Sequence, residues 1–122
     1  MSNEITLAKA EFKLDLDNAG INVLDYVPER ITPPIVIMNS ASPYITPSSL
    51  GREYFLALEL VCVASTATNK QATEKLDEAI EQVLVAMPRY ARVLRVNEPY
   101  EMQTNNASYL AANISVELEI TI

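Results

Sequence analysis

A long alternating segment near the C-terminal end constrains the fold more than any other feature of this sequence. In YLAANISVELEITI, residues 109–122, every even position from Leu110 to Ile122 is apolar, and most positions between them are polar. A period of two residues is that of a β-strand, whose successive side chains point to opposite faces of a sheet. The segment therefore predicts a long strand with one buried face.

A helical pattern lies in TNKQATEKLDEAIEQVLVAMP, residues 68–88. Its apolar side chains recur at the spacing of one helical face; they are Ala72, Leu76, Ala79, Ile80, Val83, Leu84 and Met87. Thr68 and Gln71 have the spacing of a capping box, and Pro88 ends the pattern because proline disfavours helical geometry in the residue before it. We expect an amphipathic helix that packs on the sheet.

The other strands are expected in four apolar segments. EYFLALELVCVAS (53–65) is apolar on both alternating faces apart from Glu59, which suits a central strand covered on both sides. Shorter strands are expected in INVLDYV (21–27), PPIVIM (33–38) and YARVLRVNEP (90–99).

The N-terminal segment EITLAKAEFKLDLDNAG, residues 4–20, fits the period of a helix and that of a strand. We favour a helix with Gly20 as its left-handed C-terminal residue. The predicted order is then helix, strand, strand, strand, helix, strand, strand. This is an α+β fold with a mostly antiparallel sheet, formed by a single domain over residues 1–122.

The composition excludes several classes of function. Nine basic and sixteen acidic residues give a net charge of −7, which argues against attraction to nucleic-acid phosphates. The chain has no histidine for a Ser-His-Asp or Cys-His site, and its two glycines are too few for a phosphate-cradling loop. Cys62, the only cysteine, cannot form a disulfide within the chain and is expected to be a small buried hydrophobic residue.

Paired carboxylates are the remaining candidates for catalysis or metal binding. They are Asp15 with Asp17, Asp77 with Glu78, and Glu117 with Glu119. The helix pair and the C-terminal pair fall on the polar side of their predicted elements, where solvated carboxylates are expected. We therefore expect no catalytic residue, no metal ligand and no cofactor. No apolar run reaches the roughly 18 residues of a bilayer span, and no membrane partner is expected.

Prolines cluster in one region: five of the seven lie between Asp25 and Ser49. Because proline fixes φ and lacks an N–H, we predict a long, stiff, unpaired loop over residues 40–52. Loops of that length are often functional, although a tolerated surface insertion is the alternative. Tyr44 lies in mid-loop with no predicted element to pack against. The candidate docking residues are Pro43, Tyr44, Ile45, Pro47 and Leu50.

Four segments together carry a resemblance to known proteins; they are AGINVLDYVPERITPPIVIM, SPYI, TEKLDEAIEQVL and YLAANISVELEI. In these segments the sequence resembles the tail terminator or tail-completion proteins of long-tailed bacteriophages. The resemblance implies a virion protein of the tail, assembled in the host cytoplasm as a homo-oligomeric ring, usually of six subunits. Such a ring caps the tail tube protein, stops its polymerisation and joins the tail to a neck or head-completion protein, while DNA passes through without specific binding.

Ring subunits need two different surfaces that meet head to tail. Arg92 and Arg95 could meet acidic faces of a neighbouring subunit, or could be solvated surface arginines. The acidic candidates are Glu74, Asp77, Glu78, Glu81, Glu117 and Glu119. Two alternatives stay open: a neck or head-completion protein of the same virion, and a small-molecule-binding or accessory enzyme domain with Tyr26 and Tyr54 in its pocket.

Overall fold

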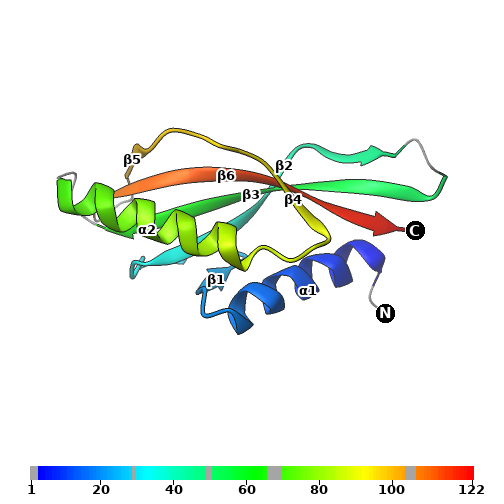
Figure 1. Ribbon diagram of the computed structural model, residues 1–122, viewed down its shortest axis with the longest axis horizontal. Helices are drawn as coiled ribbons and strands as arrows, with labels where there is room; N and C mark the ends of the chain where they lie inside the picture. Colours follow the sequence, from blue (N-terminus) through cyan, green and yellow to red (C-terminus); the bar gives the residue numbers. More distant parts are fainter. Residues whose placement is uncertain (1–2, 29, 49–50, 66–69, 104–106) are drawn as a thin grey trace.

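The computed structural model describes residues 3–28, 30–48, 51–65, 70–103 and 107–122 and shows an α+β fold with two helices and a six-stranded sheet (Figure 1). In chain order the described elements are α1 (Glu4–Asn18), β1 (Val23–Leu24), β2 (Ile35–Pro47), β3 (Glu53–Ser65), α2 (Lys70–Ala86), β4 (Ala91–Val96), β5 (Tyr100–Gln103) and β6 (Ser108–Thr121).

Helix α1 confirms the predicted N-terminal helix. Its first turn is capped by Asn3, whose side-chain oxygen accepts a hydrogen bond from the Thr6 backbone N–H at 2.8 Å. After Asn18 the chain turns through Gly20 at a φ of +90°, the left-handed conformation that glycine adopts most readily. The segment also fitted the period of a strand because Phe12, Leu14 and Leu16 are apolar at alternate positions. In the helix Phe12 and Leu16 are buried, whereas Leu14 is exposed.

Helix α2 confirms the predicted amphipathic helix. Ala72, Leu76 and Val83 are buried, whereas the four acidic residues of the helix are exposed. Met87 donates its backbone N–H to the Leu84 carbonyl just before Pro88. Thr68, the predicted capping residue, lies outside the described residues.

The sheet is mixed, which corrects the expectation in one detail. The strand order is β1-β2-β3-β6-β4, with β5 also pairing to β6. Strands β2, β3, β4, β5 and β6 pair antiparallel, but β1 pairs parallel to β2, with Val23 opposite Val36. Strand β5 was not predicted, since its four residues are too few to show a period. β6 is central: β3 lies along one of its edges, and β4 and β5 share the other.

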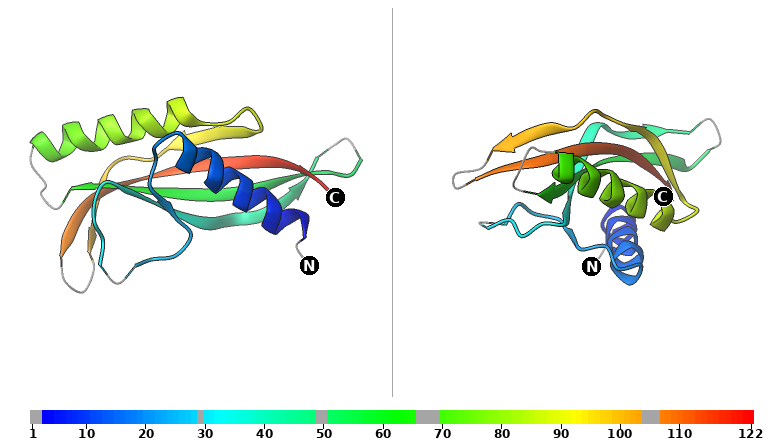
Figure 2. Two further views of the ribbon diagram at one scale, coloured as in Figure 1. Left: turned by 90° about the horizontal axis from the view of Figure 1, so that it is seen from below. Right: turned by 60° about the vertical axis from the view of Figure 1, so that its left-hand side comes forward.

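Both helices lie on the same face of the sheet, as Figures 1 and 2 show. They enclose the main core, which joins Phe12 and Leu16 of α1 and Leu76 of α2 to the inward side chains of β3 and β6. The even-numbered residues of β6 that the sequence assigned to a buried face are buried from Leu110 through Ile120. Ile122, which the sequence placed on the same buried face, lies just after β6 and is 52% exposed.

The opposite face of the sheet is covered over only part of its area. There a smaller core joins Ile35, Val63 and Tyr109 to Ile31 of the segment between β1 and β2. The Tyr109 hydroxyl donates a hydrogen bond to the Ile31 carbonyl at 3.3 Å. Toward the other end of the sheet, Phe55, Ala57 and their neighbours are only half-buried, so β3 is not covered on both sides along its whole length as predicted.

Candidate functional site

The predicted loop over residues 40–52 is wrong for most of its described length. β2 continues to Pro47 and pairs with β3, placing Ile45 opposite Leu56 and Pro47 opposite Tyr54. The register shifts between Ser40 and Ile45, so the pairing is interrupted there by a bulge that contains Pro43. Leu50 lies outside the described residues.

The position of β2 in the sheet explains why a proline-rich segment can be a strand. Beyond Ile37, no described strand pairs with the outer edge of β2. Prolines are confined in sheets to edge strands and bulges, because only there is no ladder hydrogen bond lost. They also block edge-to-edge association with other strands. The cluster of prolines therefore fits a protected sheet edge.

Tyr44 is not the unsupported residue that the sequence suggested. Its ring and Ile45 both contact the main core. Lys9 of α1 donates a hydrogen bond from Nζ to the Tyr44 hydroxyl at 2.8 Å and lies 5.4 Å from the ring centroid. Of the candidate docking residues that the structure describes, Pro43 and Pro47 are exposed, whereas Tyr44 and Ile45 hold the hairpin to the body of the protein.

A polar network lies on the less covered face of the sheet, which we call the open face and define by Glu53, Glu59, Arg92, Asn113, Glu117 and Glu119. Asn113 donates its amide N–H to Glu59 Oε1 at 2.9 Å and accepts a hydrogen bond from the Tyr100 hydroxyl at 2.8 Å. Partial burial raises the pKa of Tyr100, and the nearby Glu59 charge raises it further. The Tyr100 hydroxyl thus remains a donor.

Carboxylates on the open face also interact with one another. Glu53 of β3 and Glu119 of β6 are neighbours, and their hydrogen bond and like charges raise the pKa of Glu53. Glu117 forms an ion pair with Arg92 at 3.1 Å across the β4–β6 ladder. The open face carries four carboxylates, and two arginines of β4 share it, Arg92 opposite Glu117 and Arg95 opposite Ser115, so carboxylates remain in excess.

The predicted ring-interface charges occupy two separate surfaces. Arg92 and Glu117 pair within the chain, whereas the described residues show no ion pair for Arg95, which is exposed. Glu119 lies beside Glu53 on the open face. The other four, Glu74, Asp77, Glu78 and Glu81, are exposed along α2.

Two further side chains, Cys62 and Tyr90, have a raised pKa. Cys62 is buried in the main core, and burial raises the pKa of its thiol to about 11. Tyr90 donates a hydrogen bond to the Asp15 carboxylate, and burial together with that carboxylate raises the pKa of Tyr90 strongly. Within the described ranges, no group of three or more cysteine, aspartate or glutamate side chains is placed to hold a metal ion.

No protein-family model matches the chain, and no curated protein matches it either. Among the described residues, neither helix is long and apolar enough to cross a membrane.

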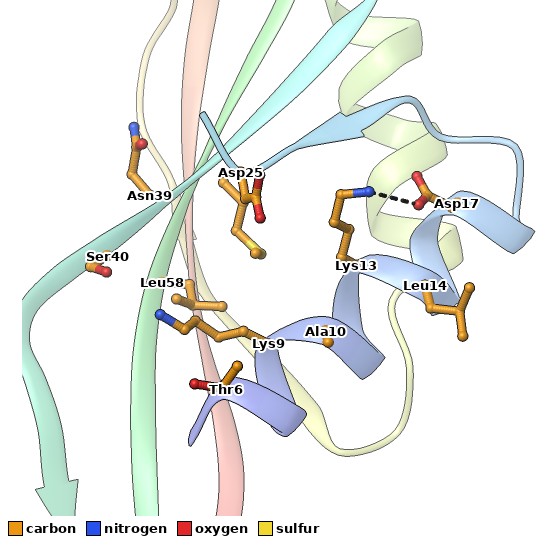
Figure 3. A pocket seen from close by; sticks show the side chains of 11 residues that line it. Thr6, Lys9, Ala10, Lys13, Leu14, Asp17, Asp25, Asn39, Ser40 and Leu58 are labelled. Carbon is orange, nitrogen blue, oxygen red and sulfur yellow. Dashed lines mark hydrogen bonds and ion pairs between the residues drawn. The ribbon is translucent and has the colours of Figure 1, made fainter. Parts of the chain in front are cut away.

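Some of these residues were missed by the sequence analysis. Lys9, Asn113 and Tyr100 gave no pattern, because each depends on a partner far away in the sequence. Glu59 was the exception, since it is the only charge inside an otherwise apolar strand. Tyr26 is 60% exposed, Tyr54 is half-buried against the main core, and neither lines the groove shown in Figure 3.

Proposed function

We propose that this chain is a structural virion protein, a tail terminator subunit that assembles as a ring on the end of a tail tube. The proposal combines the sequence resemblance given above with the surface chemistry of the fold. In the proposed ring the chain binds itself, the tail tube protein and a neck or head-completion protein, and DNA passes through the centre.

The observation that carries the proposal is the acidic open face of a sheet whose other face is covered by both helices. Glu119 is exposed, whereas Glu53, Glu59 and Glu117 are half-buried, and all four lie on this one face. A wall of this kind repels phosphates, which keeps a passing duplex from binding to it. We assign the open face to the channel side of the ring.

The exposed prolines of the β2–β3 hairpin support the rest of the proposal. Pro43 and Pro47 keep the outer edge of β2 from pairing with other strands, while Tyr44 and Ile45 fix the hairpin to the main core. A hairpin held in this way offers a stiff surface for a partner, because little conformational entropy remains to be lost on docking. We assign it to the contact with the tail tube or the neck.

The test of assembly is the native mass of the purified chain over a concentration series, with negative-stain imaging and an assay of tube length. A ring with a central hole, and tubes of tail protein that stop growing when the chain is added, support the terminator function. A compact dimer without a hole and tubes of unchanged length overturn it. A ring that binds DNA-filled heads but leaves tube growth unchanged favours the neck protein instead.

A charge-reversal variant tests the assignment of the open face to the channel. Replacing both neighbouring carboxylates, Glu53→Lys with Glu119→Lys, makes the open face less acidic without touching the helices. Rings of this variant are expected to bind duplex DNA at low salt, whereas wild-type rings are not. The matched control is Glu98→Lys with Glu101→Lys, the same charge change outside the open face. Equal DNA binding by both variants would contradict the assignment of the open face to the channel.

A further inference from the structure

Strand β1 is short and leaves part of the outer edge of β2 without a neighbour. β1 consists of Val23–Leu24 only and pairs parallel with β2 as far as Ile37. If β1 continued in the same register, Asp25 would lie opposite Met38. No described strand pairs with the outer side of β2 from that point on. We call the outer side of residues 38–40 the open edge.

The backbone of β2 directs hydrogen-bonding groups to the open edge. The Val36 N–H donates outward, to the Asn22 carbonyl at 2.8 Å. Backbone groups alternate in direction along a strand, so those of Met38 and Ser40 also point outward. Beyond β1, the Met38 carbonyl and both backbone groups of Ser40 have no described strand beside them. An added strand would bond to these groups.

The prolines that protect the rest of this edge do not protect residues 38–40. Pro43 lies in the bulge and Pro47 at the end of β2, whereas Met38, Asn39 and Ser40 precede both. The open edge is therefore the part of β2 beyond β1 where strand addition is not blocked by a proline.

A groove of about 680 Å³ lies along the open edge, between α1 and strands β2 and β3 (Figure 3). Residues 38–40 form part of one wall, and α1 forms the other. In Figure 3, Asp25 lies between α1 and β2, and it is the residue that directly follows β1. The groove therefore occupies the place that a longer β1 would fill. The apolar residues that line it are Ala10, Leu14, Met38 and Leu58.

The charged residues that line the groove balance one another. Lys13 forms an ion pair with Asp17 at 3.0 Å. Lys9 donates a hydrogen bond to the Tyr44 hydroxyl at 2.8 Å, and its positive charge is matched by the negative charge of Asp25. The groove thus has no net charge to attract an acidic or a basic partner. Its free backbone groups are what select an occupant.

We propose that an extended segment of another protein binds in this groove as an additional strand beside residues 38–40. Its backbone pairs with the outward groups of Met38 and Ser40, about 4.8 Å from β2. Every second side chain of the segment points toward α1, where Ala10 and Leu14 favour an apolar residue. The segment is therefore uncharged, free of proline and apolar at alternate positions. This contact needs no ring and goes beyond the proposed function.

A second copy of the chain has no free segment of this kind among its described residues. Every described strand already pairs within its own sheet. Outside helices and strands, residues 25–28, 30–34, 87–90 and 97–99 each contain a proline, which lacks the N–H that pairing requires, and residues 19–22 form the turn after α1. A second copy would have to give up a strand of its own sheet, so a different protein is the better occupant.

Peptide selection on the full-length chain tests the proposal. The probe is a library of short random peptides displayed on yeast, and the strongest peptide is then synthesised. Ser40→Pro removes an outward N–H and leaves the pairing with β3 in place, because the Ser40 backbone faces the open edge. This variant is expected to bind the peptide about tenfold more weakly than wild type, or worse. Thermal unfolding checks that it folds.

A second variant tests the α1 wall without touching the sheet. Ala10→Arg places a long side chain in the groove from an exposed helix position and is expected to block the peptide. The matched control is Glu11→Arg, which adds the same side chain to α1 at an exposed position outside the groove. Peptides methylated at single backbone nitrogens keep their side chains and lose one donor each. Methylation at alternate positions is expected to abolish binding, as strand pairing requires.

Enriched peptides that are apolar at alternate positions and sensitive to Ser40→Pro, Ala10→Arg and backbone methylation support the added strand. A library that yields no binder, or binders that all three changes leave unaffected, overturns it. Binders blocked by Ala10→Arg but indifferent to methylation show a groove that recognises side chains, which also overturns it. Wild-type dimers that both variants abolish identify a second copy as the occupant and overturn the choice of another protein. None of these results requires a tail tube, so the proposed function stands or falls separately.

Discussion

The hydroxyl of Tyr90 donates a hydrogen bond to the carboxylate of Asp15, and this bond ties the start of β4 to helix α1. The two residues are 75 positions apart in the sequence, and α1 makes its other main contacts with the sheet through apolar side chains. The bond is partly buried and its acceptor is charged, which makes it one of the stronger classes of hydrogen bond in a protein. It links the first helix to the edge of the sheet formed by β4.

We predict that Tyr90→Phe lowers the free energy of unfolding by about 1–2 kcal/mol, because it removes a hydrogen bond to a charged group and leaves Asp15 without that donor. Asp15→Asn is expected to cost less, since the amide oxygen still accepts. Urea unfolding of both single variants and the double variant measures the coupling between the residues. Strictly additive losses would contradict the bond.

Tyr90 also predicts a dependence on alkaline pH. Its pKa is raised in the folded protein, so the folded state keeps the phenolic proton that the unfolded state releases near pH 10. The stability contributed by this group is complete below pH 10 and is lost as the pH rises further. Tyr90→Phe should therefore lose less stability than wild type between pH 9 and pH 11, as measured by thermal unfolding with Tyr26→Phe as the control.

The neighbouring carboxylates of the open face predict the effect of acid. Glu119 raises the pKa of Glu53 in the folded state, so this group favours folding when it is protonated, and that contribution is lost as the pH rises through the raised pKa. We expect Glu119→Gln to raise the unfolding temperature at pH 7 and to have a smaller effect near pH 4. Glu98→Gln is the control, and an equal effect of both variants would contradict the pairing.

The arginines of β4 are predicted to differ although they share a strand. Arg92 pairs with Glu117, which is only 16% exposed, and removal of Arg92 leaves that carboxylate without its counter-charge. We expect Arg92→Ala to cost up to about 1 kcal/mol more stability than Arg95→Ala, with the difference shrinking in high salt. Chemical unfolding at low and high ionic strength measures the difference. Identical values for the two variants would rule out a stabilising pair.

The outer edge of β2 gives a prediction about association. The Ser48 N–H bonds to the Glu53 carbonyl at 2.9 Å, so the nitrogen of the preceding residue, Pro47, points away from β3 and toward the free edge. Pro47→Thr adds a donor at that edge and should increase aggregation on heating with little change in the unfolding midpoint. Light scattering during heating measures this aggregation, with Thr46→Ser as the control. Unchanged scattering would show that Pro47 does not protect the edge.

Cys62 is predicted to be unreactive while the chain is folded. It is buried and its thiol has a pKa of about 11, so little thiolate forms at pH 8 and reagents have no access to it. A disulfide reagent should label the native chain at the rate of unfolding and the urea-unfolded chain at once. Rapid labelling of the native chain would contradict burial of the thiol.

The strongest sequence signals were the ones confirmed by the structure. The alternation in residues 109–122 predicted β6, and the periodic apolar positions of residues 72–87 predicted α2, because each pattern is set by one continuous buried face. Both patterns are local. They depend on the period of the element itself and not on which other element covers it.

What the sequence did not predict depends on neighbours. Proline is excluded from central strands but allowed at edges. The extension of β2 to Pro47 could therefore not be predicted without knowing that no described strand pairs with its outer side beyond Ile37. The parallel pairing of β1 and the ion pair of Arg92 with Glu117 both depend on register between distant segments. The groove beside α1 also needs the position of β2, which no helical pattern contains.

The position of β6 has a consequence for synthesis of the chain. Among the described strands, β6 is made last, yet it lies in the interior of the sheet and is the only strand that β4 and β5 pair with. Until it leaves the ribosome, β3 has an unpaired apolar edge, and the two shorter strands have no partner. The sheet can therefore be completed only after residues 108–121 have emerged. A chain that stalls on the ribosome before them exposes the unpaired edge of the β2–β3 hairpin, which is prone to aggregation.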